Sequence, residues 1–286
     1  MSQTIIALAI NGIVFGLIVA LIALGLSIIF GLLDIINLSH GDFFMVGTVI
    51  AFTTLTSMGF FWPALIIAPL IGFILGALIQ FSIIQRIKNN AALSIVATFG
   101  LSMIIQEVVR MTFGAAPKRI MPPISGTFGM FGIEYEWYRI FAAFASIIAI
   151  GSFFIFLRST KLGTWMRAVR HDRDTATTMG IPSQRVYLFT FGIGFAMAAV
   201  GGVIAAPITT VDFRTGVDIL PFCFMAVIIG GLGNLPGTVA AAVLLAFLEG
   251  VISGFANPTI ARIFSLVLMS GVLLLRPQGL FKGLAK

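Results

Sequence analysis

The segment DIINLSHGD, Asp34–Asp42, separates two long hydrocarbon-rich runs and decides how this chain must fold. It carries two carboxylates, an asparagine, a serine and a histidine, and no lysine or arginine occurs before Arg86. A charged side chain at the centre of a bilayer costs roughly 2.5–3.5 kcal/mol, so such groups usually face a protein interior or a wet cavity. The runs on either side must therefore fold around this segment.

The composition is that of a polytopic membrane protein. Of 286 residues, 59% are hydrophobic and only 9% are charged, and the mean hydropathy is +1.12. A soluble domain carries about 25% charged residues. The apolar runs are continuous instead of alternating, which excludes a β-barrel. Backbone N–H and C=O groups in lipid must form hydrogen bonds within their own segment, so the runs must be helices. We predict an all-α fold, a transmembrane helix bundle that forms one domain over residues 1–286.

Eight or nine membrane crossings are predicted. A crossing helix needs about 20 residues, and the run at 219–231 is shorter than that. Discontinuous helices are expected near 31–42, where Gly31 and Gly41 flank the polar residues, and near 230–237, where several glycines interrupt the apolar pattern. The predicted spans are 4–30, 43–58, 61–84, 91–109, 138–157, 186–207, 219–231, 237–254 and 259–275.

The distribution of positive charge predicts the orientation. Eleven of the 17 Lys and Arg residues fall at 86–88 (two), 158–185 (six) and 276–286 (three). Short loops rich in Lys and Arg face the cytoplasm. We therefore expect the C-terminus to be cytoplasmic, the N-terminus to be outside, and residues 110–137 to form an ordered external loop. Because these charges sit in short loops, the net charge of +7 does not indicate binding of nucleic acid.

Small residues recur at every fourth position in two of the spans. Such stripes let helix backbones approach closely in lipid. Packing inside the bundle is the preferred interpretation, and a subunit interface is the alternative. The stripes are Ala68, Gly72 and Gly76, and Gly194, Ala198, Gly202 and Ala206.

Two interpretations of Asp34–Asp42 compete. It is either an ordinary loop at the cytoplasmic surface or a helix break that lines a passage. The absence of Lys and Arg favours the break, because a cytoplasmic loop normally carries them. Irregular backbone at membrane depth is tolerated where protein or water satisfies it. The predicted passage residues are Asn37, Ser39, His40, Gly41 and Asp42.

A second glycine-rich break, GGLGNLPG at Gly230–Gly237, repeats an Asn-Leu pair at Asn234. We predict that Asn234 lines the same passage. A tight turn is the alternative. The repetition hints at a duplicated unit.

The sequence argues against an enzyme. The run Ser39-His40-Gly41-Asp42 holds the letters of a catalytic triad, but neighbouring residues cannot converge as a triad must. There is no HExxH or CxxC metal motif, and no Gly-Lys pair that a phosphate-binding loop would need. We expect no metal and no cofactor in this chain, so any ATP hydrolysis must occur on another subunit.

The basic loop at 158–185 contains a predicted short amphipathic helix, 164–181, that ends at Gly180-Ile181-Pro182. Trp165, Met166 and Val169 form its apolar set. It either docks against a partner or rests on anionic lipid. Elsewhere, a structural ion pair between Glu249 and Arg262 is expected, together with a local pair between Glu107 and Arg110.

Four stretches together resemble the branched-chain amino acid (Liv-type) permease family of bacterial ABC importers. They are ALGLSIIFGLLDIINLSHGD, KLGTWMRAVRHDRDTATTMGI, GGLGNLPGTVAAAVLLAFLEG and LLLRPQGLFKG, and their order and spacing agree from end to end. The resemblance implies a permease subunit of the bacterial inner membrane for branched-chain or other small neutral amino acids. Relatives also move urea and short amides. Implied partners are a second homologous permease or another copy of this chain, two cytoplasmic ATPases that hold ATP and Mg, and a periplasmic substrate-binding protein.

The basic loop is similar to the EAA motif of ABC importers. Asp174, Ala176 and Gly180 match its acid, second alanine and glycine, whereas Thr175 replaces the first alanine and the downstream Ile-x-Leu-Pro is absent. The resemblance implies that this loop couples the permease to its ATPases, with Trp165, Met166 and Val169 as apolar contacts. Two alternatives remain. An ion-coupled secondary transporter would need a buried ion site, for which Asp34 and Asp42 are the only candidates, and a passive channel for urea or ammonium would need no coupling loop.

Overall fold

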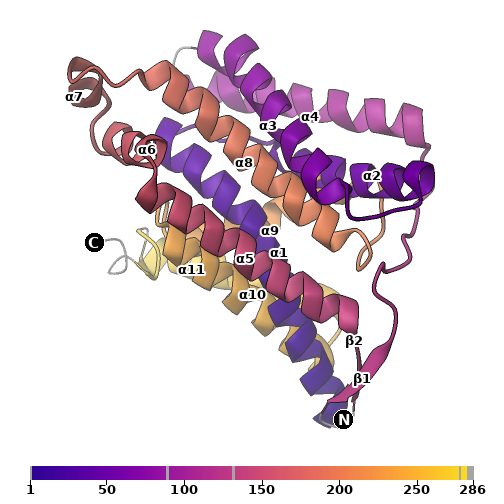
Figure 1. Ribbon diagram of the computed structural model, residues 1–286. Helices are drawn as coiled ribbons and strands as arrows, with labels where there is room; N and C mark the ends of the chain where they lie inside the picture. Colours follow the sequence, from indigo (N-terminus) through magenta and orange to yellow (C-terminus); the bar gives the residue numbers. More distant parts are fainter. Residues whose placement is uncertain (1, 88–89, 131–132, 277, 282–286) are drawn as a thin grey trace.

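The computed structural model describes residues 2–87, 90–130, 133–276 and 278–281. Helices dominate it (Figure 1). They are α1 (Ser2–Leu33), α2 (His40–Met58), α3 (Ala64–Ser82), α4 (Ala91–Phe113), α5 (Trp137–Ser159), α6 (Lys161–His171), α7 (Arg173–Thr178), α8 (Ser183–Ala205), α9 (Thr215–Gly230), α10 (Leu235–Phe255) and α11 (Pro258–Leu275), with a 3₁₀ turn η1 at Ile84–Arg86. Two short strands, β1 (Thr127–Met130) and β2 (Ile133–Glu136), complete the fold.

The prediction of an all-α membrane bundle is confirmed. Within the described ranges, eight helices are long and apolar enough to cross a membrane, and α9, with 16 residues, is shorter. The uncertainty between eight and nine crossings thus falls on the short span at 219–231, as predicted. The helix there begins earlier, at Thr215.

Helix α1 runs through the middle of the bundle and contacts α5, α8, α9 and α10 (Figure 1). Glycines on α1 and α10 permit a close contact between these two helices. A Cβ atom at Gly12 would lie 2.5 Å from the carbonyl oxygen of Ala246 on α10, and one at Gly250 would lie 2.5 Å from that of Leu8. The two helices therefore meet backbone to backbone.

The small-residue stripes pack inside the bundle, as preferred above. Gly72 on α3 lies against Phe195 on α8, where an added Cβ would be 3.0 Å from the carbonyl oxygen. On α8, a Cβ at Gly202 would collide with the backbone carbonyl of Phe44 on α2. Both stripes therefore bring α2 and α3 onto α8.

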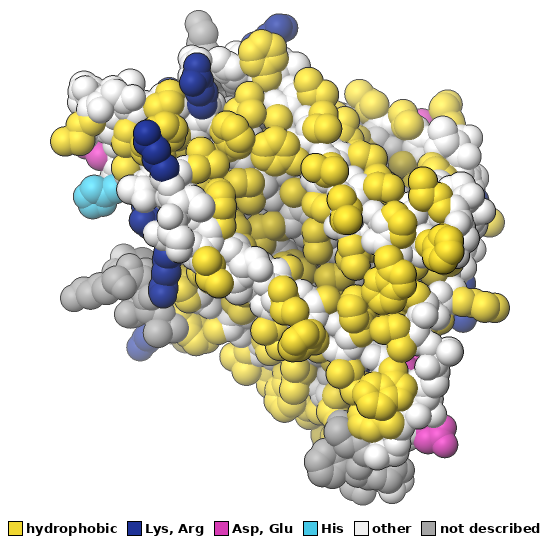
Figure 2. All heavy atoms as spheres, viewed as in Figure 1, with side chains coloured by type: hydrophobic (Ala, Val, Ile, Leu, Met, Phe, Trp, Pro, Cys, Tyr) yellow, Lys and Arg dark blue, Asp and Glu magenta, His cyan; other side chains and the backbone are white. Residues whose placement is uncertain are grey.

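The two ends of the bundle differ in charge. Helices α6 and α7 and the last described residues lie at one end, which we call the basic end, and Lys and Arg side chains gather along it (Figures 1 and 2). The N-terminus and the strands lie at the opposite end, which we call the hairpin end. The termini are thus on opposite sides, as an odd number of crossings requires.

The hairpin was not predicted. Strands β1 and β2 pair antiparallel, with Thr127 opposite Glu136, inside the segment that was expected to be an ordered loop. An antiparallel bridge between Lys118 and Val211 ties the same segment to the connection between α8 and α9. Backbone pairing thus orders this segment, and the sequence showed no strand pattern long enough to reveal it.

Apolar side chains cover much of the face shown in Figure 2. They come from helices whose outer faces are exposed, including α3, α4 and α5. Such a surface is that of a protein surrounded by lipid. Large exposed examples are Ile66, Leu70, Leu78, Val96, Met103, Met111, Phe144 and Ile155.

The predicted ion pair between Glu249 and Arg262 is wrong. In the described part of the chain, no such pair forms within 4 Å, and Arg262 instead donates to the carbonyl oxygen of Asp218 at 3.2 Å. The prediction rested on the fact that α10 and α11 follow each other in the chain, and this does not determine where their side chains point. The local pair between Glu107 and Arg110 is confirmed, with a shortest N–O distance of 2.6 Å.

Replacing Gly202 by Ala tests the close packing of α2 on α8. Because the new methyl group would meet the Phe44 backbone, we expect a loss of about 1–3 kcal/mol in stability and a lower melting temperature in detergent. Gly151→Ala on α5 is the matched control, since nothing lies within 4 Å of a Cβ there. Equal melting temperatures for the two variants would contradict the packing.

Candidate functional site

The predicted break in the first hydrophobic stretch is present and covers residues 34–39. Helix α1 ends at Leu33 and α2 begins at His40, so Gly31 and Gly41, which were expected to flank the break, lie within helices. Asp34 ends α1 with a left-handed φ of 51°, the only positive φ of a non-glycine residue in the described ranges. The chain reverses there.

The segment after Asp34 re-enters the bundle. His40 lies deep beside α1, because its Nε2 is 3.0 Å from the carbonyl oxygen of Ile22. Ile22 precedes the last residue of α1 by eleven positions (33 − 22), which is about 16 Å along a helix axis. The break therefore extends into the interior and does not remain at the surface of the basic end.

Four side chains near the break form what we call the polar cluster: Asn37, Ser39, His40 and Asp42. The exposed fraction is 0% for the first three residues and 1% for Asp42. Ser39 donates its backbone N–H and its hydroxyl to Asn37 Oδ1, at 3.0 and 2.8 Å. Gln106 on α4 donates to Asp42 Oδ1 at 3.1 Å. The cluster is closed to solvent in this conformation.

Three atoms of the polar cluster have no hydrogen-bond partner among the described residues. They are Asn37 Nδ2, His40 Nδ1 and Asp42 Oδ2. Leaving a buried polar group unpaired costs about 1–3 kcal/mol, and each instance in a folded protein calls for an explanation. Unpaired buried groups of this kind are explained by strain, by a functional role or by a bound water or ion, so the polar cluster is a candidate functional site.

The N-termini of α2 and α9 meet beside the polar cluster. A Cβ at Gly41 would collide with the carbonyl oxygen of Gly216, so the two helices touch within one turn of their first residues, His40 and Thr215. The N-terminal end of a helix carries a partial positive charge. Two such ends thus lie in contact beside the polar cluster.

Two polar pockets flank the polar cluster. The pocket on its hairpin side, about 320 Å³, is lined by Met103, Gln106, Glu107, Arg110, Phe213 and Arg214. The pocket on its basic side, about 270 Å³, is lined by Leu33, Ile35, Gln80, Ile84, Gln85, Arg173, Gln184 and Tyr187. Gln106 connects the first pocket to Asp42, and Ile35 lies two residues before Asn37. Polar side chains therefore continue from both ends of the bundle toward the polar cluster.

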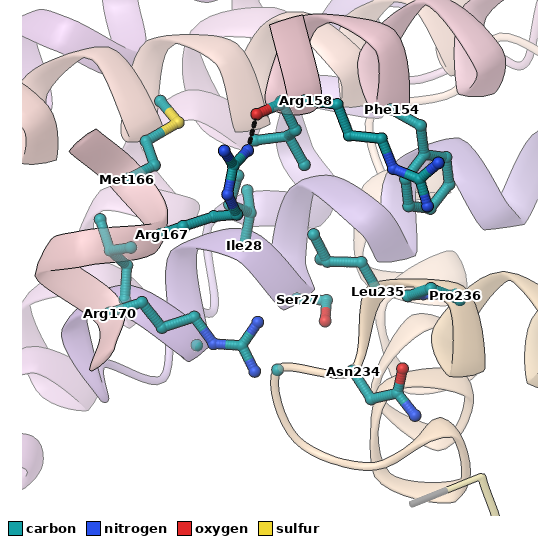
Figure 3. Close-up of a pocket in the computed structure, with 14 residues that line it drawn as sticks. Ser27, Ile28, Phe154, Arg158, Met166, Arg167, Arg170, Asn234, Leu235 and Pro236 are labelled. Atoms are coloured by element: carbon teal, nitrogen blue, oxygen red, sulfur yellow. Dashed lines mark hydrogen bonds between the residues drawn. The ribbon is translucent and has the colours of Figure 1, made fainter. Parts of the chain in front are cut away.

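Asn234 lies elsewhere, at the second break. It begins α10, accepting the backbone N–H of Gly237 at 3.1 Å, and its Nδ2 donates to the carbonyl of Phe281 at 2.7 Å. It lines a third cavity of about 290 Å³, which we call the arginine pocket (Figure 3). Asn37 is not among the residues of that cavity. The two asparagines share one local role, since each accepts a backbone N–H near the start of the next helix.

The basic loop forms two helices, α6 and α7, where one was predicted. Asp172 separates them because its Oδ1 accepts the N–H groups of Asp174 and Thr175 and thereby caps α7. The Thr175 hydroxyl also donates to this carboxylate at 2.6 Å, which holds the pKa of Asp172 below its usual value. The local capping bonds of Asp172 outweighed the helical pattern.

The predicted turn at Gly180 is present. Its φ is 85°, and Ile181 donates its N–H to the carbonyl of Ala176 at 3.1 Å. This six-residue bond is that of a glycine-terminated helix end. A residue with a bulky side chain would be strained at Gly180.

Several predicted coupling residues face inward. Met166, Val169 and Ala176 are buried, with exposed fractions of 1%, 3% and 4%, so they fasten the loop to the bundle. Trp165 is half-buried under Lys161, whose Nζ lies 5.1 Å from the ring centroid. Asp174 is exposed, and so is Met179, at 79%. Met179 was not predicted as a coupling residue, because one continuous helix would have placed its side chain differently.

Comparison with known proteins places the chain in a family. The family described as "Branched-chain amino acid transport system / permease component" matches residues 8–273. The chain belongs to this family. No significant match exists among solved structures.

Relatives match the permease along nearly its whole length. It is 29% identical to the high-affinity branched-chain amino acid transport system permease protein LivH of Salmonella typhimurium, covering 94% of this chain and 93% of the relative. Identity to BraD, the corresponding permease protein of Pseudomonas aeruginosa, is 26%, with 95% and 94% covered. LivM of Escherichia coli, a second permease protein of such a system, is 24% identical over 91% of this chain and 67% of the relative.

Membership of this family has direct consequences. The permease is a multi-pass membrane component of an ABC transporter and is not itself the catalytic subunit. ATP is bound by partner ATPases in such systems. The similarity to both LivH and LivM indicates a heteromeric transporter.

Cysteine labelling tests the closed arrangement of the site. In a background without Cys223, which is itself buried, Gln85→Cys and Arg214→Cys should react with a membrane-impermeant thiol reagent from opposite sides of the membrane. Asn37→Cys should be protected in the resting protein, because Asn37 is fully buried. Labelling of Gln85→Cys and Arg214→Cys from the same side would contradict the placement of the two pockets.

Proposed function

We propose that this permease carries a branched-chain or other small neutral amino acid into a bacterial cell through a pathway centred on the polar cluster. The observation that carries this proposal is the buried, incompletely paired cluster lying between two polar pockets. We infer that residues 1–286 form one transmembrane domain in the inner membrane, with the N-terminus outside and the C-terminus in the cytoplasm. The concentration of Lys and Arg at the basic end supports this orientation.

The chemistry around the polar cluster suits a zwitterion with an apolar side chain. The N-termini of α2 and α9 would attract a carboxylate, as the ends of broken helices do in other transporters. Asp42 Oδ2 is unpaired and could accept from an ammonium group. Phe43 and Phe195 stack with ring centroids 3.8 Å apart and supply an apolar wall.

In this proposal, Asn37, Ser39, His40, Gly41 and Asp42 line the pathway once it opens. The contact of Gly41 with Gly216 then separates, and the unpaired atoms of the polar cluster meet the substrate. Asn234 would act at the second break, where it begins α10.

A urea or short-amide permease of the same family is the second candidate. Side-chain amides favour it, since Gln106 reaches the polar cluster and Gln80, which is 4% exposed, has an unpaired Oε1 in the basic-side pocket. Uptake of labelled leucine and labelled urea by the same transporter distinguishes the two. An ion-coupled secondary transporter is set aside because the family is that of an ABC component.

We also propose that α6 and α7 couple the permease to two cytoplasmic ATPases, while a periplasmic binding protein delivers the substrate and a homologous permease completes the pathway. Asp174 and the turn at Gly180 would face the ATPase, and Trp165 would border that contact. Met166, Val169 and Ala176 would transmit its movement, because they join the loop to the bundle.

Asn37→Leu tests the pathway. The variant removes the acceptor for Ser39 and adds an apolar group to the polar cluster, so we expect uptake to fall at least about tenfold, which corresponds to about 1.4 kcal/mol. Assembly and ATP hydrolysis by the purified complex should survive. Asn257→Leu is the control, because the Asn257 side chain also accepts a backbone N–H near a helix start but is exposed at the hairpin end. Normal uptake by Asn37→Leu would exclude the polar cluster from the pathway.

Gly180→Leu tests the coupling loop. Leucine is strained at a φ of 85°, so the bundle should fold while the ATPases are lost when the complex is purified. Gly180→Asn is the control, since asparagine tolerates this backbone conformation. Retention of the ATPases by Gly180→Leu, together with normal transport, would mean that this turn is not part of the coupling contact.

A further inference from the structure

Three arginines line the arginine pocket at the basic end. Arg158 comes from α5, and Arg167 and Arg170 come from α6 (Figure 3). In the described part of the chain, no carboxylate lies within 4 Å of any of them, and the two ion pairs that form lie on α4 and at the start of α5. Three like charges around one cavity repel one another unless an anion joins them.

The arginines retain unused hydrogen-bond donors. Arg167 donates to the carbonyl of Leu157 and, at 3.3 Å, to the hydroxyl of Thr164. Within the described ranges, Arg158 and Arg170 donate to no protein acceptor. A guanidinium group offers five N–H donors in a planar fork that fits two oxygens of a phosphate. The pocket is therefore prepared for a phosphate-bearing anion.

The remaining lining of the arginine pocket is mainly apolar. Its side chains come from α1, α5, α6 and the start of α10, so the cavity is amphipathic as well as basic. It also lies where α5 ends, next to an outer face of α5 that exposes large apolar groups such as Ile155. The apolar lining residues are Ile28, Leu32, Phe154, Leu157, Met166, Leu235 and Pro236.

We propose that the arginine pocket binds an anionic phospholipid, with the headgroup phosphate on Arg158, Arg167 and Arg170 and an acyl chain along the apolar wall. Basic pockets between transmembrane helices bind the headgroups of such lipids. A soluble phosphate compound would satisfy the arginines but would leave the apolar wall without an occupant. This site is separate from the polar cluster and does not depend on which solute the permease carries.

A lipid in this pocket would hold α6 in place. Arg170 already rests on the turn between α9 and α10, where a Cβ at Gly233 would lie 2.8 Å from its Nη2. A phosphate bridging Arg170 to Arg158 would join α6 to α5 as well. Lipid binding should therefore stabilise the packing of α6 against the bundle.

The test uses the assembled transporter, stripped of bound lipid in detergent. Phosphatidylglycerol should raise its melting temperature saturably, phosphatidylcholine should not, and native mass spectrometry should show retained phosphatidylglycerol. Arg158→Gln with Arg170→Gln should weaken this binding at least about tenfold. The double variant Arg158→Lys with Arg170→Lys keeps both charges and should retain most of the phosphatidylglycerol binding. Its retention would show that the loss in the glutamine variant reflects lost charge and not misfolding.

Arg276→Gln is the matched control, because Arg276 lies at the end of α11 and does not line the pocket. Three results would overturn the proposal. The first is equal stabilisation by phosphatidylcholine, and the second is an equal loss of binding in Arg276→Gln. The third is full replacement of phosphatidylglycerol by glycerol phosphate or inorganic phosphate, which would make the pocket a site for soluble anions.

Discussion

The structure depends on one constraint, which is that the polar backbone and side chains of residues 34–39 must find partners inside an apolar bundle. Irregular backbone at membrane depth is tolerated only where protein or water satisfies it. Here α1, α4 and α8 all contact residues at the break, and Thr98 on α4 accepts the backbone N–H of Leu38 at 3.1 Å. Such enclosure requires helices that approach to backbone contact, which explains glycine at Gly41, Gly202 and Gly216.

The fold was largely predictable from the sequence because its main signals are local. Long apolar runs with few charges can only be helices in lipid, and the polar segment had to interrupt them. The bounds were less predictable. Gly31 and Gly41 were interpreted as helix breakers, yet both are helical, and a Cβ on either would crowd a neighbouring backbone at Gly233 or Gly216. Whether glycine breaks a helix or permits close packing depends on neighbours that are distant in the sequence.

This dependence on neighbours distant in the sequence also explains which contacts of the candidate site were not predicted. The polar cluster residues were named from one short segment. Thr98, which accepts from neighbouring Leu38, and Gln106, which donates to Asp42, lie 60 and 64 positions later in the chain. Only the topology brings α4 to the break. Asp172 shows the opposite case, because its capping bonds reach only two or three residues ahead. The apolar pattern and the stop signal at Gly180 favoured one continuous helix, so this local signal was overlooked.

A continuous set of contacts joins the basic loop to the polar cluster. Arg170 on α6 lies against Gly233, in the short turn that follows the last residue of α9, Gly230. At its other end, α9 touches α2 through Gly216 and Gly41. A helix of 16 residues is about 24 Å long, so α9 spans the distance between these two contacts. In the proposed coupling, a displacement of α6 would shift this turn and, through α9, separate the two helix N-termini beside the polar cluster. Glycine stands at both contacts because only bare backbone lets neighbouring groups approach so closely at each end.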